Sequence, residues 1–590
     1  MSSVSQVDKV VNARRQRRRG PGQPSKPTPA RIQGINREIV QAALAGDEIP
    51  SDEALAAADG VSERTVRDIR LRLLGLNRRE LKRWMQASRT ASAADQTTER
   101  ELICATPFAG LWLLVPQIID SELAKAANLL QITQRTRVLA IHIVLTLVAW
   151  AVLGFQRLFH VDDYRHWADM GLALFTGHGH LWSDTTLWRW VPGVTPERAA
   201  LFYQRTVAPI VGHPDSQGRF SLDEHVVPSF TNRHPRPLGK TRVPSRGRSY
   251  PAFRLYAIFD LDLGRFAGLL VRKAREALSQ VLPDLLAEVR GLRRHAQVPD
   301  PDGVRLIIDR GGYKGSLFEM LMEDPQVSFI AMARATAVNV RQWEVIPEDE
   351  FQPYQPKDVD NPNLKLALAV THVSKCKHPL SSVVIRDDTP DTKQRWRVLF
   401  YKNQPHQDPT AEEIDAEYRQ RQHQELGFSQ YVHALAGNCL PKAYEMIRVP
   451  NAQGQKRTTV DTAETTDSQR AVHLVAWIKF LTFNLIQDFG VALGPDQANR
   501  QVATLVRRYI MRPGRLYLHN GQLIVQLDPF RGHEALQPFI HQLNQRGLPI
   551  PWLSGVILQV EIAGQPQGLA AVPQVIGQRI LANSTAASPL

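Results

Sequence analysis

The sequence predicts a multidomain α/β protein, and three observations support this fold class. The chain has 590 residues, of which 43% are hydrophobic and 22% are charged, so it is able to bury more than one hydrophobic core. Residues 220–334 alternate between strand-like and helix-like patterns, whereas residues 102–211 have mainly helical periodicity. The first 33 residues are rich in arginine, proline and glycine and cannot form a core. These contrasts exclude disorder of the whole chain and predict several domains.

The charge of the chain is positive and unevenly distributed. Lys and Arg total 72 against 58 Asp and Glu, which gives a net charge of +14 at pH 7. Residues 1–100 hold nineteen basic and twelve acidic residues, so they carry half of the excess in about a sixth of the chain. Such a balance favours a polyanionic partner, either nucleic acid or an anionic membrane. The concentration of charge near the N-terminus favours DNA.

The cysteines and the apolar segments predict a cytoplasmic protein that does not enter a membrane. The three cysteines are far apart in the sequence, and no CxxC pair or signal peptide is present. Two segments, 138–155 and 471–493, approach the length of a membrane span. Both contain polar residues, however, so we expect them to form buried helices of a large protein.

Residues 35–85 show the spacing of a helix-turn-helix unit. In the window that begins at Asp52, four residues occupy the positions on which such a unit depends: Ala56, Gly60, Val66 and Ile69. A small alanine lets the two helices touch, glycine accepts the turn, and the two branched residues fix the second helix. Arg64, Arg67 and Arg70 are then exposed and able to face a major groove of DNA. An ordinary helical hairpin with a basic face is the alternative.

Residues 216–334 give the clearest topology. Strands are expected at 220–227, 254–261, 266–271, 304–309 and 327–332, with helices at 276–290 and 316–322. Three strands joined directly, followed by a helix and a returning strand, form the order of a mixed sheet with ribonuclease-H-like topology. The segment Leu306-Ile307-Ile308 is apolar on both faces, as expected of a central strand.

The remaining boundaries follow from changes in composition. A mostly β insertion is expected at 335–405, with strands at 365–372, 381–386 and 396–401, and a helix follows at 410–427. Asn520-Gly521 between two apolar runs predicts a hairpin, and a further strand is expected at 556–562. The predicted parts are a basic arm (1–34), the helix-turn-helix domain (35–85), a linker (86–100), a helical domain (101–215), the core in two parts (216–334 and 406–500) around the insertion, a C-terminal α+β region (501–563) and a tail (564–590).

Two aspartates lie on neighbouring strands of the predicted sheet. Asp223 lies within the first strand, and Asp309 ends the fourth. Two carboxylates a few ångströms apart repel each other unless a cation lies between them, and hard divalent ions such as Mg²⁺ prefer such an oxygen environment. For Asp309 alone, a role as a turn former or helix N-cap is an equal alternative.

A third acid lies in the helix expected after the insertion. Tyr418, Arg421 and Glu425 are spaced by three and four residues, so they project from one face of a helix. A phosphodiester site needs these groups: a carboxylate for metal, a guanidinium for phosphate oxygens and a phenol that fixes the geometry. A solvated helix is the alternative, because many other residues of this segment are also charged.

These motifs together resemble the DDE transposases of bacterial insertion sequences, in the branch with the signature Tyr-x2-Arg-x3-Glu-x6-Lys. The resemblance covers residues 219–427 and implies that Asp223, Asp309 and Glu425 hold two Mg²⁺ or Mn²⁺ ions. It also places Tyr418 and Arg421 on the phosphate. The activity that it implies is cleavage of transposon ends and transfer of the cut strand into target DNA. A homodimer that joins two DNA ends at the bacterial nucleoid is the expected assembly.

One residue departs from the signature, whose lysine would fall at Val432; the candidates to take its place are His433 and Lys442. Two alternative functions follow: a transposase-derived DNA-binding regulator, or a metal-dependent nuclease without strand transfer. A separate basic segment lies between the first two predicted strands and includes Arg242, Arg246 and Arg248. We expect this segment to hold the DNA backbone, and a loop made soluble by its charge is the alternative.

Overall fold

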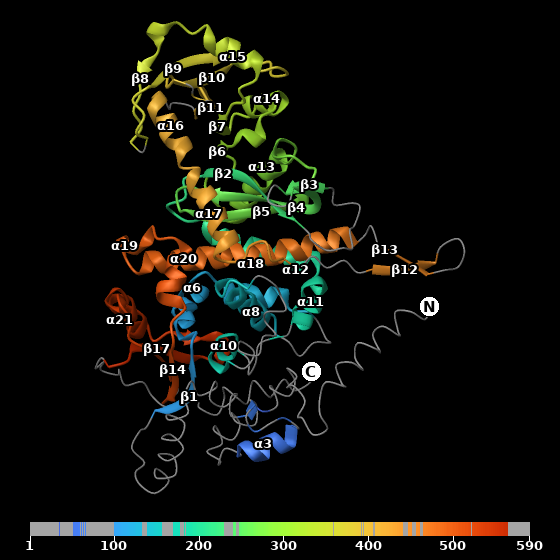
Figure 1. Cartoon of the computed structure of the whole chain (residues 1–590), viewed down its shortest axis with the longest axis vertical. Coiled ribbons are helices and arrows are strands. Elements are labelled where there is room, and N and C mark those ends of the chain that lie inside the picture. The colour runs from blue at the N-terminus through green and yellow to red at the C-terminus, as the bar shows by residue number, and fades with distance from the viewer. Residues whose placement is uncertain are drawn as a thin grey trace. The chain divides into compact units, whose positions relative to one another are not determined.

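The computed structural model describes residues 100–564 with short gaps, and fourteen residues nearer the N-terminus (Figure 1). The gaps are 133–138, 156–168, 178–181, 183, 229–239, 244–246, 358, 391, 393, 405–407, 441–445, 451–455, 461–463 and 521. The chain divides into two compact units, of which the first combines 1–112, 161–181 and 511–590, and the second combines 113–160 and 182–510. Each unit is described by itself.

The second unit is built on a ten-stranded mixed sheet in the order β3-β4-β2-β6-β7-β11-β10-β9-β8, with β5 also paired to β4. Its first strands are β2 (Arg219–Pro228), β3 (Lys240–Val243), β4 (Arg248–Asp260), β5 (Arg265–Lys273), β6 (Val304–Ile308) and β7 (Val327–Met332). Strands β2, β4 and β5 are antiparallel, whereas β2, β6 and β7 are parallel. The sheet is therefore mixed, and β2 and β6 are neighbours as the sequence predicts.

One strand is longer than predicted. β4 begins at Arg248 and pairs with the short strand β3, so part of the basic segment expected to be a loop forms a hairpin. Its added part is buried from Tyr250 to Phe253, but Pro251 argued against a strand in the sequence because proline is uncommon in strands. Arg242 and Arg248 lie in this hairpin, although their side chains are outside the described part, as is all of Arg246.

The β insertion continues the same sheet. It contains β8 (Gln352–Pro353), β9 (Leu364–Thr371), β10 (Leu380–Asp387), β11 (Trp396–Lys402) and the helix α15 (Ala337–Glu344). The three predicted strands are confirmed, and α15 and β8 are additional. Strand β11 pairs antiparallel with β7 from Leu399 opposite Met332 to Lys402 opposite Phe329, so the insertion and the core share one hydrogen-bonded ladder.

Helices pack against this sheet and against one another. The helices that the site and core depend on are α8 (Ala140–Val152), α12 (Pro196–Val211), α13 (Leu278–His295), α14 (Gly315–Glu323), α16 (Ala411–Arg419), α17 (Gln422–His433) and α18 (Glu464–Ala492). The other elements of this unit are α6 (Val115–Asp120), α7 (Leu123–Ala127), α11 (Asp184–Gly193), α19 (Pro495–Ala498), α20 (Val502–Leu505), the β12–β13 hairpin (Met446–Pro450 and Lys456–Val460), and short turns of 3-10 or π-helix.

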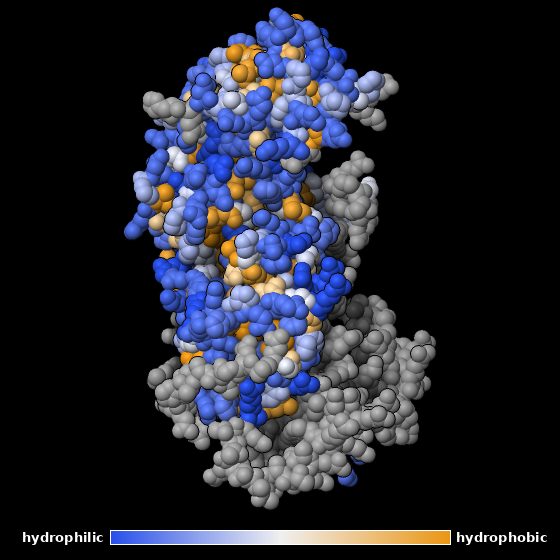
Figure 2. All heavy atoms as spheres, turned by 90° about the vertical axis from the view of Figure 1, so that its left-hand side faces the viewer, coloured by the Kyte–Doolittle hydropathy of each residue, from blue (hydrophilic) through white to orange (hydrophobic). Residues whose placement is uncertain are grey.

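The long helix α18 is the core helix of the unit. It lies along β5, where the amide of Asn484 accepts from the backbone N–H of Phe266 at 3.0 Å and donates to its carbonyl at 2.9 Å. Residues 471–492 are long and apolar enough to cross a membrane, but 89% of this stretch is buried inside the protein. Helix α8 is also wholly buried and has only 13 residues. Among the coloured residues of Figure 2, hydrophilic ones prevail on the surface and hydrophobic ones are scattered. Both apolar segments thus form buried helices, as predicted.

The first unit has a five-stranded sheet in the order β1-β14-β15-β17-β16. Its elements are β1 (Glu101–Thr106), α10 (Met170–Phe175), β14 (Gly514–His519), β15 (Gln522–Leu527), α21 (Gln537–Arg546), β16 (Pro549–Ile550) and β17 (Val556–Ile562). The predicted hairpin is confirmed, because His519 pairs with Gln522 and Asn520 has a positive φ of 47°. Strand β1 was not predicted: its six residues lie in a segment of helical periodicity, and its partner β14 is distant in sequence.

Only part of the helix-turn-helix segment belongs to the described residues. Helix α3 (Asp52–Asp59) coincides with the first predicted helix, and Ala56 and Val66 are buried. Gly60 and the three arginines Arg64, Arg67 and Arg70 lie outside the described residues, so the helix-turn-helix unit stays a prediction.

Candidate active site

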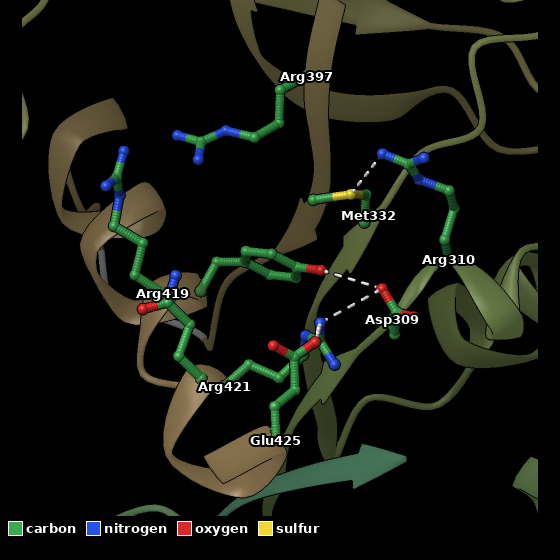
Figure 3. A pocket seen from close by; sticks show the side chains of 9 residues that line it. Asp309, Arg310, Met332, Arg397, Arg419, Arg421 and Glu425 are labelled. Atoms are coloured by element: carbon green, nitrogen blue, oxygen red, sulfur yellow. Dashed lines mark hydrogen bonds and ion pairs between the residues drawn. The ribbon is translucent and has the colours of Figure 1, made fainter. Parts of the chain in front are cut away.

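Three carboxylates from separate elements surround one guanidinium (Figure 3). Arg421 Nη1 lies 3.2 Å from Oδ2 of Asp223, and Arg421 Nη2 lies 3.7 Å from Oδ1 of Asp309. The same Nη2 forms an ion pair with Oε1 of Glu425. The structure therefore brings together the three acids of the predicted triad. The cation that lies among them is an arginine of the predicted stripe.

The sheet places the two aspartates side by side. Strands β2 and β6 run parallel, with Leu222 opposite Ile308, so Asp223 and Asp309 are the next residues on neighbouring strands. Strand β6 is buried along its whole length and ends where the polar Asp309 begins a short turn. The Asp309 side chain makes no capping hydrogen bond to that turn. Its carboxylate is thus available to the site, which disfavours the alternative role as an N-cap.

The third acid is positioned by a break between two helices. The predicted single helix is divided into α16, which ends at Arg419, and α17, which begins at Gln422. Helix α17 lies directly on the sheet: Gln424, which is fully buried, donates from Nε2 to the carbonyl of Ala257 in β4 at 3.1 Å. Gly427 permits this approach, because a Cβ there would stand 3.3 Å from the ring of Phe266.

Tyr418 completes the group. Its side chain is buried, its hydroxyl donates a long hydrogen bond of 3.5 Å to Oδ1 of Asp309, and its ring lies 5.9 Å from Cζ of Arg421. Burial, more than the nearby carboxylates, raises the pKa of the Tyr418 phenol above its ordinary value. Tyr418 therefore remains a neutral hydrogen-bond donor at neutral pH.

The surroundings of Asp223 disfavour its charged form. Burial, with smaller contributions from Asp309 and Glu425, raises the pKa of Asp223 to about 6, against the opposing effect of Arg421. The three acids carry more negative charge than one guanidinium balances. The site therefore favours additional positive charge.

Replacing Asp223 by Asn is expected to stabilise the metal-free protein at pH 8 by about 1–2 kcal/mol. The pKa of Asp223 is higher in the folded than in the unfolded chain, so its charge costs stability as the pH rises from about 4 to about 6. The benefit should shrink as the pH falls below about 6 and vanish near pH 3, where both states are largely protonated. Denaturant unfolding at both pH values measures the difference, and the exposed Asp215→Asn serves as the control. A protein that is no more stable at pH 8 than the wild type would contradict this account.

The donor set matches a divalent metal ion in chemistry, since Mg²⁺ and Mn²⁺ prefer carboxylate oxygens. Within the described part of the chain, no three Asp, Glu, His or Cys side chains are arranged to hold a metal directly. The ion pairs of Arg421 account for this arrangement, because they draw the three carboxylates toward the guanidinium. The residues thus fit a metal provided that the guanidinium shifts from its place among them.

A pocket of about 340 Å³ opens at this site. Its lining consists of Asp309, Arg310, Met332, Arg397, Tyr418, Arg419, Arg421, Gln422 and Glu425. Sequence reasoning missed three of the arginines. Arg310 and Arg419 directly follow the motif residues Asp309 and Tyr418, so their place near the site could have been predicted from the sequence. Arg397 belongs to the insertion, and nothing in its local sequence predicts that it reaches the pocket. The helix α16 is also less solvated than its charges indicate, because Asp415 on it is fully buried.

The other carboxylates near the sheet have structural partners. Glu224 points away from Asp223 along the strand and pairs with Arg254 at 2.6 Å. Asp260 is buried at the end of β4 and accepts the backbone N–H groups of Asp262 and Leu263 at 2.9 Å. Asp262 itself pairs with Arg219. None of these three forms an ion pair with Arg421 among the described residues.

The position of the missing signature lysine lies farther along α17. Val432 is half-buried and His433 is exposed, whereas Lys442 is outside the described residues. His225 on β2 contacts α17 and the segment that follows it: its ring stacks on Phe428 of the helix at 5.6 Å, and its Nε2 forms a hydrogen bond of 2.8 Å with Asn438.

Comparison with known proteins does not assign the chain to a family. No family model matches the chain, and no curated protein matches it. Among solved structures, the chain is similar to the cryo-EM structure of the piggyBac transposase synaptic complex with hairpin DNA. The identity is 10% and the TM-score is 0.34, over 68% of this chain and 79% of that chain. A likeness at this level shows neither a family nor a function.

Proposed function

We propose that the protein is a DNA transposase, which cleaves phosphodiester bonds at transposon ends and joins the freed ends to target DNA. The observation that carries the proposal is the convergence of Asp223, Asp309 and Glu425 on Arg421 beside Tyr418. Three distant segments of the chain meet here with the groups that phosphodiester chemistry requires: Asp309, Tyr418, Arg421 and Glu425 line one pocket, and Asp223 contacts Arg421 from the neighbouring strand. We infer that the triad and the two positioning residues have the roles that the sequence resemblance implies.

The sheet order supports a ribonuclease-H-like core. Three antiparallel strands, β5, β4 and β2, are followed across the sheet by β6 and β7, which run parallel to β2. This is the order proposed from the sequence, and it places the acids of β2 and β6 next to each other.

Each residue of the site then has a chemical task. Asp223, Asp309 and Glu425 would hold two Mg²⁺ or Mn²⁺ ions, which supply Lewis acidity for in-line attack on phosphorus. Arg421 would donate its two N–H edges to phosphate oxygens once DNA enters, because a guanidinium binds a phosphate as it binds a carboxylate. The hydroxyl of Tyr418 would orient Asp309 or a phosphate oxygen. The attacking group would be water in the first step and the freed 3′-hydroxyl of DNA in the second.

Recognition of the DNA ends is assigned to the basic N-terminal region. The predicted second helix of the helix-turn-helix unit would lie in the major groove, and the basic segment that includes Arg242, Arg246 and Arg248 would contact the backbone. Synapsis of two ends would involve a homodimer. A cytoplasmic location is consistent with this proposal.

Replacing Arg67 by Ala is expected to weaken binding to end DNA by about 1–3 kcal/mol if the guanidinium reads a base edge. Fluorescence anisotropy with end DNA and with a scrambled duplex measures the loss. Specific reading predicts that the loss is large only for the end sequence. An equal loss on both duplexes would show a phosphate contact instead.

The proposal is tested with DNA that flanks the reading frame, where inverted repeats are expected. Purified protein and Mg²⁺ are incubated with a supercoiled plasmid that carries these repeats, and with one that carries scrambled repeats. Cleavage at the repeats followed by recombinant products supports a transposase. An intact plasmid that the protein nevertheless shifts in a gel identifies a DNA-binding regulator and refutes the enzymatic function.

A second candidate is a metal-dependent nuclease without strand transfer. The observation that favours it is Val432, which stands where the signature has lysine. In the same assay, such a protein would nick or cut DNA and give no recombinant products.

A further inference from the structure

We propose that the same pocket contains a second subsite, formed by Arg310, Arg397 and Arg419, which binds a DNA backbone phosphate next to the one that is cut. The inference rests on the proposed function and deepens it. Figure 3 shows Arg397 and Arg419 close together and Arg310 beside Met332, whereas Asp309, Arg421 and Glu425 gather elsewhere in the pocket. In this view the three guanidiniums lie away from Arg421 and Glu425, with that of Arg310 across the pocket from the other two; these two parts of the pocket are called its basic end and its acidic end.

Carboxylates outnumber guanidiniums at the acidic end of the pocket, whereas guanidiniums outnumber carboxylates at the basic end. At the acidic end, three carboxylates face one guanidinium. At the basic end, Arg397 and Arg419 share one carboxylate, that of Asp415. Arg310 makes no ion pair with any described carboxylate, and its guanidinium donates to the weak acceptor Sδ of Met332 at 3.2 Å. The basic end therefore has an excess of positive charge, while the acidic end has an excess of negative charge.

Asp415 holds two of the arginines in fixed positions. Its carboxylate is fully buried and accepts Arg397 Nη2 at 2.6 Å on one oxygen. The other oxygen accepts Arg419 Nε at 2.7 Å and the hydroxyl of Tyr354 at 2.6 Å. Because the carboxylate lies behind them, the two guanidiniums are oriented before any ligand arrives. Such preorganisation is typical of binding sites and lowers the entropy lost on binding.

The basic end also has hydrogen-bond donors without acceptors. Nε of Arg397 and Nη2 of Arg419 are buried and have no partner among the described residues. Buried N–H groups of a charged side chain are costly when unpaired, so most are satisfied in folded proteins. These two unpaired donors are compatible with an anionic acceptor that the protein itself does not supply.

The ligand that fits both ends is a phosphodiester chain. Guanidinium groups match phosphate oxygens in geometry, and the pocket of about 340 Å³ is larger than one phosphate needs. The acidic end repels a bare phosphate unless cations accompany it, so the reacting phosphate belongs there and a neighbouring phosphate belongs at the basic end. The basic end would then fix which phosphate along the strand reaches the triad.

The test uses the full chain in the absence of divalent metal, so that binding is measured without cleavage. Duplexes from the flanking DNA carry a single uncharged methylphosphonate at successive positions around the cut site. Arg310→Gln is the main variant because Arg310 has no carboxylate partner among the described residues, so folding should be unaffected. Arg419→Gln is the second variant. Arg395→Gln, an exposed arginine outside the pocket lining, is the matched control.

We expect Arg310→Gln to weaken binding of unmodified DNA by about tenfold, and Arg395→Gln to have little effect. At one position, the methylphosphonate should weaken binding by the wild type as much as Arg310→Gln weakens binding of unmodified DNA. The same methylphosphonate should not weaken binding by the Arg310→Gln protein any further. That non-additivity identifies the contacted phosphate. Equal and additive losses at every position would overturn the subsite.

A further arm measures binding of inorganic phosphate to the free protein by calorimetry. Phosphate binding that depends on Arg310, without any effect of the methylphosphonates, would assign the subsite to a free anion and overturn the DNA assignment. The outcome for the proposed function is separate. If the methylphosphonate effect is present but Mg²⁺ gives no cleavage in any condition, the subsite stands and the proposed activity fails.

Discussion

The Glu425→Gln protein is expected to cut end DNA about 10²–10³-fold more slowly than the wild type at saturating Mg²⁺. Glutamine keeps the size of the side chain but removes the charge that would help to hold the metal. Binding of end DNA should change by less than about twofold, because Glu425 supplies no positive charge to the backbone. Single-turnover cleavage and fluorescence anisotropy measure the two quantities on the same preparation.

Glu412→Gln is the matched control for this variant. Glu412 is an exposed residue of the adjacent helix α16, and it has no ion pair among the described residues. Its replacement should leave both cleavage and binding unchanged. Cleavage by the Glu425→Gln protein at the wild-type rate would refute the triad. Equal loss of binding and cleavage would instead indicate a folding defect.

The Arg421→Ala protein is expected to be less stable than the wild type by about 2–3 kcal/mol at pH 8 without metal. The guanidinium is the counter-ion of three carboxylates, and its side chain is only 11% exposed. Without it, Asp223 loses the interaction that holds its pKa down, so its charge becomes more unfavourable. This part of the loss should therefore shrink as the pH falls from 8 toward about 6, where Asp223 becomes protonated in both proteins.

Metal ions give the second readout for this variant. Mg²⁺ should raise the melting temperature of the Arg421→Ala protein more than that of the wild type, because no guanidinium competes for the carboxylates. Arg421→Lys is the control, since it keeps a positive charge near the acids and should retain most of the stability. Wild-type stability of Arg421→Ala at pH 8, with no larger response to Mg²⁺, would contradict the counter-ion role.

Much of the fold was predictable because its signals are local. Each predicted strand of the core coincides with an observed strand, since the apolar runs are short and turn residues separate them. The hairpin around Asn520 was predictable for the same reason. The neighbouring positions of Asp223 and Asp309 followed from the strand order, once a parallel return of the fourth strand was assumed.

Other features depend on contacts that no local pattern encodes. No proline or glycine marks the break between α16 and α17. The direction of the second helix is set instead by the packing of Gln424 and Gly427 on the sheet. The charge pattern of α16 resembled a solvated face, although Asp415 is buried by partners from other elements. Arg397 reaches the pocket from the insertion, and only the paired strands reveal this.

The pairing of β7 with β11 has a consequence for solubility. Nearly all residues of β7 are buried, and its outer side is occupied by a strand of the insertion from Phe329 to Met332. A chain that lacks residues 335–405 would expose the backbone N–H and C=O groups along this side of β7 to water. A strand of a second molecule could then pair with this open edge. The insertion therefore protects this edge from such aggregation, and removing it would remove that protection.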